Sequence, residues 1–282
     1  MSDNSKISNF SACVVLNSTV YFLIAYYFVV FALNLFSMAI ASILGFDVEL
    51  FYYGFTLAGK QWTTGDMILV FFVGNALTLL TAVLFELLYR KRREFVQTIK
   101  IFYLWVYLIS IMWFFGNIIV GAFFNFGIGA ALRALHVSFS LRLILAMIAV
   151  FAMMFLGYRS QKHIRLSSNL YYQSLSKRFV KSYFLQQIVI PIAIGIIIII
   201  LLKIPHINEY NYVDIYLLFT FAFFLVGLFF QTERIESITF KNHNITSDNL
   251  KRKSCSINYL PLVIMIIFLA IIRFGLINGV AF

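Results

Sequence analysis

The sequence predicts an all-α polytopic membrane protein, and three observations carry this prediction. Of the 282 residues, 62% are hydrophobic and only 12% are charged, whereas a soluble domain has about 45–50% apolar and about 25% charged residues. Apolar runs recur that reach the roughly 20 residues a helix needs to cross a bilayer core about 30 Å thick. The basic residues collect in short connections between these runs, which is typical of proteins with several spans.

Seven apolar runs, each bounded by charged residues or by Gly and polar clusters, are expected to cross the membrane. They are Val14–Leu44, Asp66–Tyr89, Ile101–Ile119, His136–Tyr158, Tyr183–Lys203, Tyr212–Phe230 and Tyr259–Ile277. The first run is long enough for one tilted helix or for a helix with a break. A short membrane-embedded strand or a re-entrant segment is expected after it, and the Gly-rich stretch Gly121–Leu135 is expected to be re-entrant or unwound.

The distribution of Lys and Arg predicts the orientation, because cytoplasmic loops carry an excess of basic residues. Three connections hold most of them. These are Arg90–Arg93 with Lys100; Arg159, Lys162, Arg165, Lys177, Arg178 and Lys181; and Arg234, Lys241, Lys251, Arg252 and Lys253. All three fall on one side, so the amino terminus is expected in the cytoplasm and the carboxyl terminus outside. The expected location is a bacterial cytoplasmic (inner) membrane.

The net charge of +11 does not predict nucleic-acid binding, because the basic residues form no stripe of the kind that nucleic-acid binders show. The lipid bilayer is the expected partner instead. Glu86 lies one helical turn before Arg90, so an ion pair near the end of the second span is expected. Pro191 lies inside the fifth span and is expected to kink it, because proline removes one backbone donor.

Six neutral polar residues fall in apolar context within the first half of the chain: Asn34, Ser37, Asn75, Thr78, Asn117 and Asn125. An amide or hydroxyl left without a partner in hydrocarbon costs several kcal/mol, so each of them is expected to find one. Taken singly, each is read as a hydrogen-bonding contact that holds two helices together.

The stretch Leu33–Gly54 resembles the active-site segment of the site-2 protease family, the intramembrane zinc metalloproteases. That family places H-E-x-x-H on a membrane helix, where the two His bind zinc and the Glu activates the attacking water. When the family's Gly is set on Gly45, its two His and its Glu fall on Leu33, Ser37 and Asn34. The following DVELFYYGF is similar to the family's short membrane-embedded strand.

Two further segments resemble the family in the same order. VGNALTLL, residues 73–80, is similar to the A-G-P-x-x-N helix, with Asn75 at the Pro and Thr78 at the Asn. NIIVGAFFNFG, residues 117–127, is similar to the N-x-x-P-x-x-x-x-D-G segment that brings the third zinc ligand, an Asp. Asn117 is the first residue of this segment, and Asn125 occupies the position of the zinc-binding Asp. The resemblance covers about residues 21–135.

Every position that would hold a ligand or the base differs from the family. Zinc sites in proteins are built from thiolate, imidazole or carboxylate groups. Leu33 has no donor atom, and the Ser37 hydroxyl and the Asn125 amide are weak ligands for zinc. Asn34 cannot take a proton from water as Glu does. The resemblance therefore implies a metalloprotease fold with no catalytic, metal-binding or cofactor-binding residues, and no cofactor is expected.

The expected function is that of a pseudoprotease, which binds or shields a transmembrane peptide or a partner subunit. Asn34, Ser37 and Asn125 would line its cavity, and a strand would pair with the bound peptide. That strand comprises Val48, Glu49, Leu50, Phe51, Tyr52 and Tyr53. The alternative is a small-solute transporter or channel subunit, with residues 116–129 unwound and Pro191 as a hinge. An active enzyme that recruits His136 and a purely structural subunit also remain open.

The expected organisation has three parts. Residues 1–13 form a cytoplasmic tail, and residues 14–135 form the core that resembles the site-2 proteases. Residues 136–282 add further transmembrane helices, with a cytoplasmic loop at residues 231–258.

Overall fold

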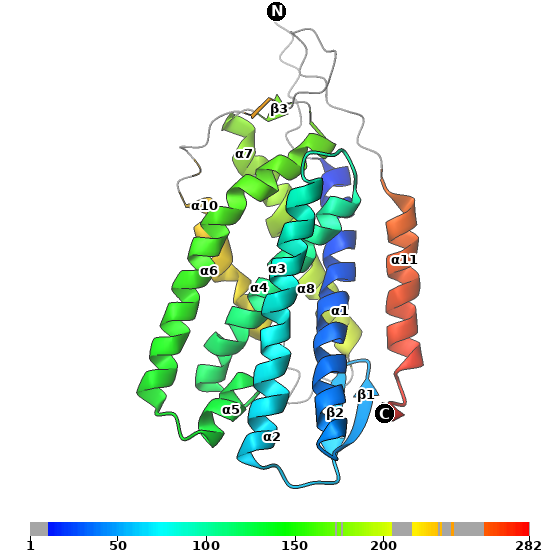
Figure 1. The fold of residues 1–282 in the computed structure, drawn as a ribbon. Coiled ribbons are helices and arrows are strands. Elements are labelled where there is room, and N and C mark those ends of the chain that lie inside the picture. The colour runs from blue at the N-terminus through cyan, green and yellow to red at the C-terminus, as the bar shows by residue number, and fades with distance from the viewer. Residues whose placement is uncertain are drawn as a thin grey trace, which may run out of the picture.

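Long helices that run alternately up and down dominate the computed structural model (Figure 1). The structure describes residues 11–172, 174–175, 177–204, 216–230, 232, 238–239 and 257–281. The amino-terminal end of the first helix lies at the top of the bundle in this view, and the strands β1 and β2 lie beside its other end.

The α-helices are α1 (Ala12–Ile43), α2 (Thr64–Ile68), α3 (Gly74–Arg92), α4 (Ile99–Phe123), α5 (Ile128–Ala134), α6 (Phe139–Ser167), α7 (Lys177–Phe184), α8 (Ile190–Lys203), α10 (Phe221–Phe229) and α11 (Tyr259–Ala270). Three π-helical segments, η1 (Leu69–Val73), η3 (Leu185–Val189) and η5 (Ile271–Gly275), continue α2, α7 and α11, and a 3₁₀ turn, η2 (Ser168–Leu170), ends α6. The strands are β1 (Asp47–Phe51), β2 (Gly54–Ala58), β3 (Ser174–Leu175), β4 (Ile238–Thr239) and β5 (Val280–Ala281).

Five helical stretches are long and apolar enough to cross a membrane, which agrees with a helical membrane protein. They are Ala12–Ile43, Thr64–Arg92, Ile99–Phe123, Phe139–Leu170 and Phe179–Lys203. Two shorter apolar helices, Tyr216–Phe229 and Tyr259–Gly275, occupy the positions of the sixth and seventh predicted spans.

Helix α4 is the centre of the bundle and packs against α1, α3 and α6. Trp105, on α4, is fully buried, and its Nε1 donates to Ser18 Oγ of α1 at 2.9 Å. Its ring meets that of Phe22 edge to face at a centroid distance of 5.0 Å. Helices α6 and α10 approach closely where Gly157 and Gly227 face the partner backbone, since small residues allow helix backbones to meet in membranes.

Helix α1 ends in a Schellman motif that leads directly into the sheet. Gly45 takes φ +87°, a conformation that a glycine adopts without steric cost. Its N–H donates to Ser42 O, and Phe46 N–H donates to Ala41 O, both at 3.0 Å. The chain then forms the antiparallel hairpin β1–β2, which confirms the short strand predicted after the first span.

The structure corrects three details of the predicted spans. The fourth helix continues to Ser167 instead of ending at Tyr158, so Arg159, Lys162 and Arg165 are helical. Within the Gly-rich stretch, α4 stays helical through Phe123 and α5 begins at Ile128. The chain between them turns over only four residues, so no long unwound segment is present there.

Two residues that the sequence singled out have local structural roles. Pro191 lies in the first turn of α8, directly after the π-helical segment η3, which shifts the backbone hydrogen bonds before the proline. His136 is exposed and follows the end of α5 with φ 54°. Its N–H donates to Arg133 O, and Val137 N–H donates to Leu132 O, so His136 takes the helix-ending position usually held by glycine.

The end of α3, the start of α4 and the end of α6, between which the first two predicted basic loops fall, lie at the same end of the bundle as the start of α1 (Figure 1). Lys100 at this end is fully buried. Its ammonium donates to Phe95 O at 3.0 Å and to Asn169 Oδ1, so it ties the α3–α4 loop to the end of α6. The third predicted basic loop, with Arg234, Lys241 and Lys251–Lys253, lies outside the described residues.

Candidate functional site

Two of the predicted polar residues meet between α3 and α4. Asn117 Nδ2 donates to Asn75 Oδ1 at 3.3 Å, and Asn75 Nδ2 donates to the Phe114 carbonyl at 3.3 Å. Both side chains are buried. Each amide therefore has a partner inside the bundle, as apolar surroundings require. We call Ser37, Asn75, Thr78 and Asn117 the polar seam.

The local backbone explains why Asn75 faces α4. The π-helical segment η1 ends at Val73, immediately before Gly74 and Asn75. A π-bulge inserts one extra residue into a helix and rotates the residues that follow, and such bulges occur often at functional sites. Thr78 Oγ1 donates to the Asn75 carbonyl at 2.7 Å, so Thr78 stabilises the turn that carries Asn75.

The segment of α1 that resembles H-E-x-x-H packs beside the polar seam. A Cβ atom built on Gly74 would lie 2.6 Å from Ser37 Oγ and 3.2 Å from Leu33 Cδ1. The two positions that correspond to the family's His therefore lie directly against Gly74. Asn117, which bonds to the neighbouring Asn75, lies close to Gly127 in turn: a Cβ atom built on Gly127 would lie 3.2 Å from Asn117 Oδ1. Three segments far apart in sequence thus converge here.

The other two predicted site residues take no part in the Asn75–Asn117 hydrogen bond. Asn34 is half-buried on α1, and Asn125 is exposed in the turn after α4. Within the described ranges, no three His, Cys, Asp or Glu side chains lie close enough to share a metal ion. The polar seam consists of neutral groups, which can donate and accept hydrogen bonds with a peptide backbone or with each other.

The predicted pairing strand lies in the middle of a three-stranded sheet with the order β2-β1-β5. Val48 and Leu50 are buried, whereas Asp47 and Glu49 are exposed, as expected for a strand with one covered face. Tyr52 and Tyr53 form the turn of the hairpin rather than part of the strand. Both edges of β1 are paired, because β5 from the end of the chain covers the edge opposite β2.

The register of this second pairing is antiparallel, with Glu49 opposite Ala281 and Leu50 opposite Val280. Tyr52 N–H donates to the Leu276 carbonyl at 3.2 Å, just beyond the paired residues. A two-residue strand so distant in the chain gives no sequence signal, and the sequence prediction missed it.

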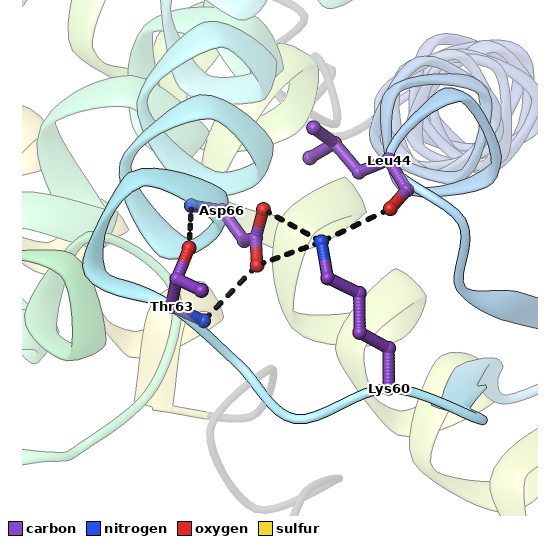
Figure 2. A network of polar contacts seen from close by, with 4 residues as sticks. All are labelled: Leu44, Lys60, Thr63 and Asp66. Carbon is purple, nitrogen blue, oxygen red and sulfur yellow. Dashed lines mark hydrogen bonds and ion pairs between the residues drawn. The ribbon is translucent and has the colours of Figure 1, made fainter.

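A polar network that the sequence prediction also missed fixes the hairpin to the bundle (Figure 2). Lys60 Nζ donates to the Leu44 carbonyl at 3.1 Å and to Asp66 Oδ1 at 3.3 Å. Asp66 Oδ2 accepts from Thr63 N–H at 3.0 Å, and Thr63 Oγ1 accepts from Asp66 N–H at 3.2 Å. The sequence signal for this capping box is T-x-x-D ahead of an apolar run.

A second cluster, of which the sequence predicted only one ion pair, lies between α3 and α6. The predicted ion pair between Glu86 and Arg90 is confirmed at 2.5 Å. His163 of α6 joins it, with Nε2 at 3.5 Å from Glu86 Oε1, and Tyr89 donates to the His163 carbonyl at 2.6 Å. These contacts join α3 to α6 and involve His163, which the sequence prediction left in the loop after Tyr158.

Comparison of the chain with protein-family models, with curated proteins and with solved structures finds no match.

Proposed function

We propose that the chain is an integral membrane protein with a site-2-protease-like core that binds an extended peptide, from a membrane protein or a partner subunit, without cutting it. The observation that carries the proposal is the antiparallel pairing of β1 with a segment from the far end of the chain. An edge that accepts one extended segment through backbone hydrogen bonds is suited to accept another, because strand addition depends mainly on the main chain.

The contacts around the polar seam support the core assignment. Leu33 and Ser37 lie against Gly74, the neighbouring Asn75 bonds to Asn117, and Asn117 lies against Gly127. The three segments that carry the resemblance are therefore neighbours in space. The side chains at the ligand and base positions, Leu33, Asn34, Ser37 and Asn125, support the non-catalytic part of the proposal, because none is a strong zinc ligand or a base.

The proposal includes an arrangement in the membrane. Seven helices cross it, counting Tyr216–Phe229 and Tyr259–Gly275 as the sixth and seventh. The end of the bundle that holds the start of α1 and the first two basic loops faces the cytoplasm of a bacterial cell, since positively charged residues are retained on that side. The sheet then lies toward the outer face, where its β1 edge can meet a peptide that leaves the bilayer.

Photo-crosslinking tests the proposal directly. A photoreactive amino acid placed at Glu49 on β1 should form adducts with a polypeptide in native membranes. The same amino acid at Leu84, an exposed residue on α3, is the matched control and should label lipid. Equal labelling at both positions would contradict peptide binding at β1. Stoichiometric zinc in the purified protein would contradict the non-catalytic assignment.

A further inference from the structure

The end of the chain occupies the edge of β1 where the proposed function places a peptide. Residues 276–281, which we call the arm, follow η5 and run antiparallel to β1 through the pairs Glu49–Ala281 and Leu50–Val280. Tyr52 N–H reaches the Leu276 carbonyl. The arm therefore uses the backbone groups of β1 that an added strand would use.

A glycine fixes how the arm sits on β1. Gly279 takes φ +74°, and a Cβ atom there would lie 2.6 Å from Phe51 Cε1 and 2.8 Å from Phe51 Cζ. The Phe51 ring is also stacked on that of Tyr53 at a centroid distance of 5.2 Å. Any other residue at position 279 would strain the backbone and collide with this ring.

Helix α11 and the strand β5 at the end of the arm are more exposed than the rest of the bundle. None of the twelve residues of α11 is buried, and both residues of β5 are exposed. Helix α11 lies along α1, and the ring of Phe268 lies 6.4 Å from those of Tyr27 and Phe31. A short exposed strand with two paired residues can separate from its neighbour without disturbing a packed core.

The arm remains anchored where it begins. The Arg273 guanidinium lies 4.2 Å from the centre of the Tyr52 ring, and Arg273 Nη2 donates to the Ile204 carbonyl at 3.0 Å. These contacts precede the arm, and Leu276 at its start is partly buried against the core, so residues 277–281 can leave β1 while η5 and Leu276 stay in place.

We infer that the arm is an internal occupant of the β1 edge, which an external peptide must displace, and that such a peptide must present a glycine opposite Phe51. The inference rests on the proposed function and specifies its ligand: an extended segment that pairs antiparallel with β1 and carries glycine at the position of Gly279. A ligand that binds only when the arm has left β1 has an apparent Kd equal to its intrinsic Kd divided by the fraction of molecules in that open state.

Two full-length variants separate the open and closed states. Gly279→Val should release the arm, because the valine side chain collides with Phe51. The double variant Glu49→Cys with Ala281→Cys should lock the arm, because opposed residues of an antiparallel pair lie about 4.5–5.5 Å apart at Cα, within disulfide range. Asn278→Ala, an exposed neighbour in the same segment, is the matched control for the release variant.

The measurement is fluorescence anisotropy of a labelled peptide with the sequence of residues 276–281, LINGVA, added to detergent-purified protein. We expect Gly279→Val to bind it at least about tenfold more tightly than the parent or Asn278→Ala, if the arm is closed about nine-tenths of the time. The locked variant should not bind until a reductant opens the disulfide. The peptide LINVVA should bind no variant, and the parent with and without reductant controls for its own cysteines.

Each other outcome overturns the inference in a distinguishable way. Equal binding to the released and locked variants would show that the arm does not occupy the binding edge, while peptide binding itself would stand. Absence of binding to every variant would overturn the inference, and absence of Glu49 adducts in membranes as well would overturn the proposed function. Equal binding of LINVVA would contradict the requirement for glycine.

Discussion

Helix α4 and the C-terminal helix α11 are both uninterrupted apolar segments, yet they have opposite places in the molecule. In the most apolar 18-residue stretch of α4, 72% of the residues are buried, whereas none of the residues of α11 is buried. Helix α4 meets α1, α3, α5 and α6, while α11 lies along α1. Apolarity thus predicts that a helix enters a membrane, but not whether lipid or protein surrounds it, because lipid tails are as apolar as side chains.

This comparison separates a fixed centre from a peripheral segment. The centre holds the polar seam, whose buried amides specify how α3 and α4 meet. The periphery holds the arm, whose backbone pairing with β1 depends on few side chains. We expect substitutions in the centre to change stability and substitutions in the arm to change binding.

Replacing one isoleucine in each helix gives the largest expected difference. Ile109 of α4 is fully buried, whereas Ile264 of α11 is 49% exposed. Ile109→Ala should lower the free energy of unfolding by about 2–5 kcal/mol, because it leaves a cavity in a packed interior. Ile264→Ala should change it by less than about 0.5 kcal/mol. Unfolding in mixed micelles measures both, and equal losses would remove the distinction between centre and periphery.

The polar seam gives an intermediate effect. Asn117→Ala removes the donor to Asn75 Oδ1 and should cost about 0.5–2 kcal/mol of unfolding free energy. Asn125→Ala is the matched control in the same segment and should have almost no effect, since Asn125 is exposed. A double-mutant cycle with Asn75→Ala should show coupling between residues 75 and 117. Additive losses would argue against a hydrogen bond that stabilises the seam.

The smallest effect is expected at the hairpin. Lys60→Met removes the link between the Leu44 carbonyl and Asp66, and the Lys60 side chain is 38% exposed. The expected loss is about 0.2–1 kcal/mol, because exposed ion pairs contribute little. Lys91→Met, at an exposed site on α3, is the control. A loss as large as that of Ile109→Ala would mean that the hairpin belongs to the fixed centre.

The sequence predicted the class of protein because hydrophobic length and the placement of charge are local properties. It placed a strand after the first span because alternation is local as well. It ended the fourth span at Tyr158 because charged residues follow, but His163 and Ser167 pack within the bundle, so α6 continues.

Pairings between distant residues could not be predicted in the same way. The sequence marked Asn75 and Asn117 as residues that need partners, but the rotation of α3 by η1 decides that they bond to each other. Asn34 and Asn125 carry the same signal and lie outside that bond. The strand β5 has only two residues, and Gly279 before it is informative only beside Phe51.

Spin labels on the two outer strands would test the central claim most directly. Thr56 of β2 and Ala281 of β5 both lie opposite Glu49 of β1, so their Cα atoms should be about 10 Å apart, two strand spacings. Labels at Thr56→Cys and Ala281→Cys should show strong dipolar broadening in the resting protein. Adding excess LINGVA peptide should remove the broadening as the arm leaves β1. Two results would contradict the claim that a peptide replaces the arm on β1. One is the absence of broadening in the resting protein, and the other is broadening that the peptide leaves unchanged.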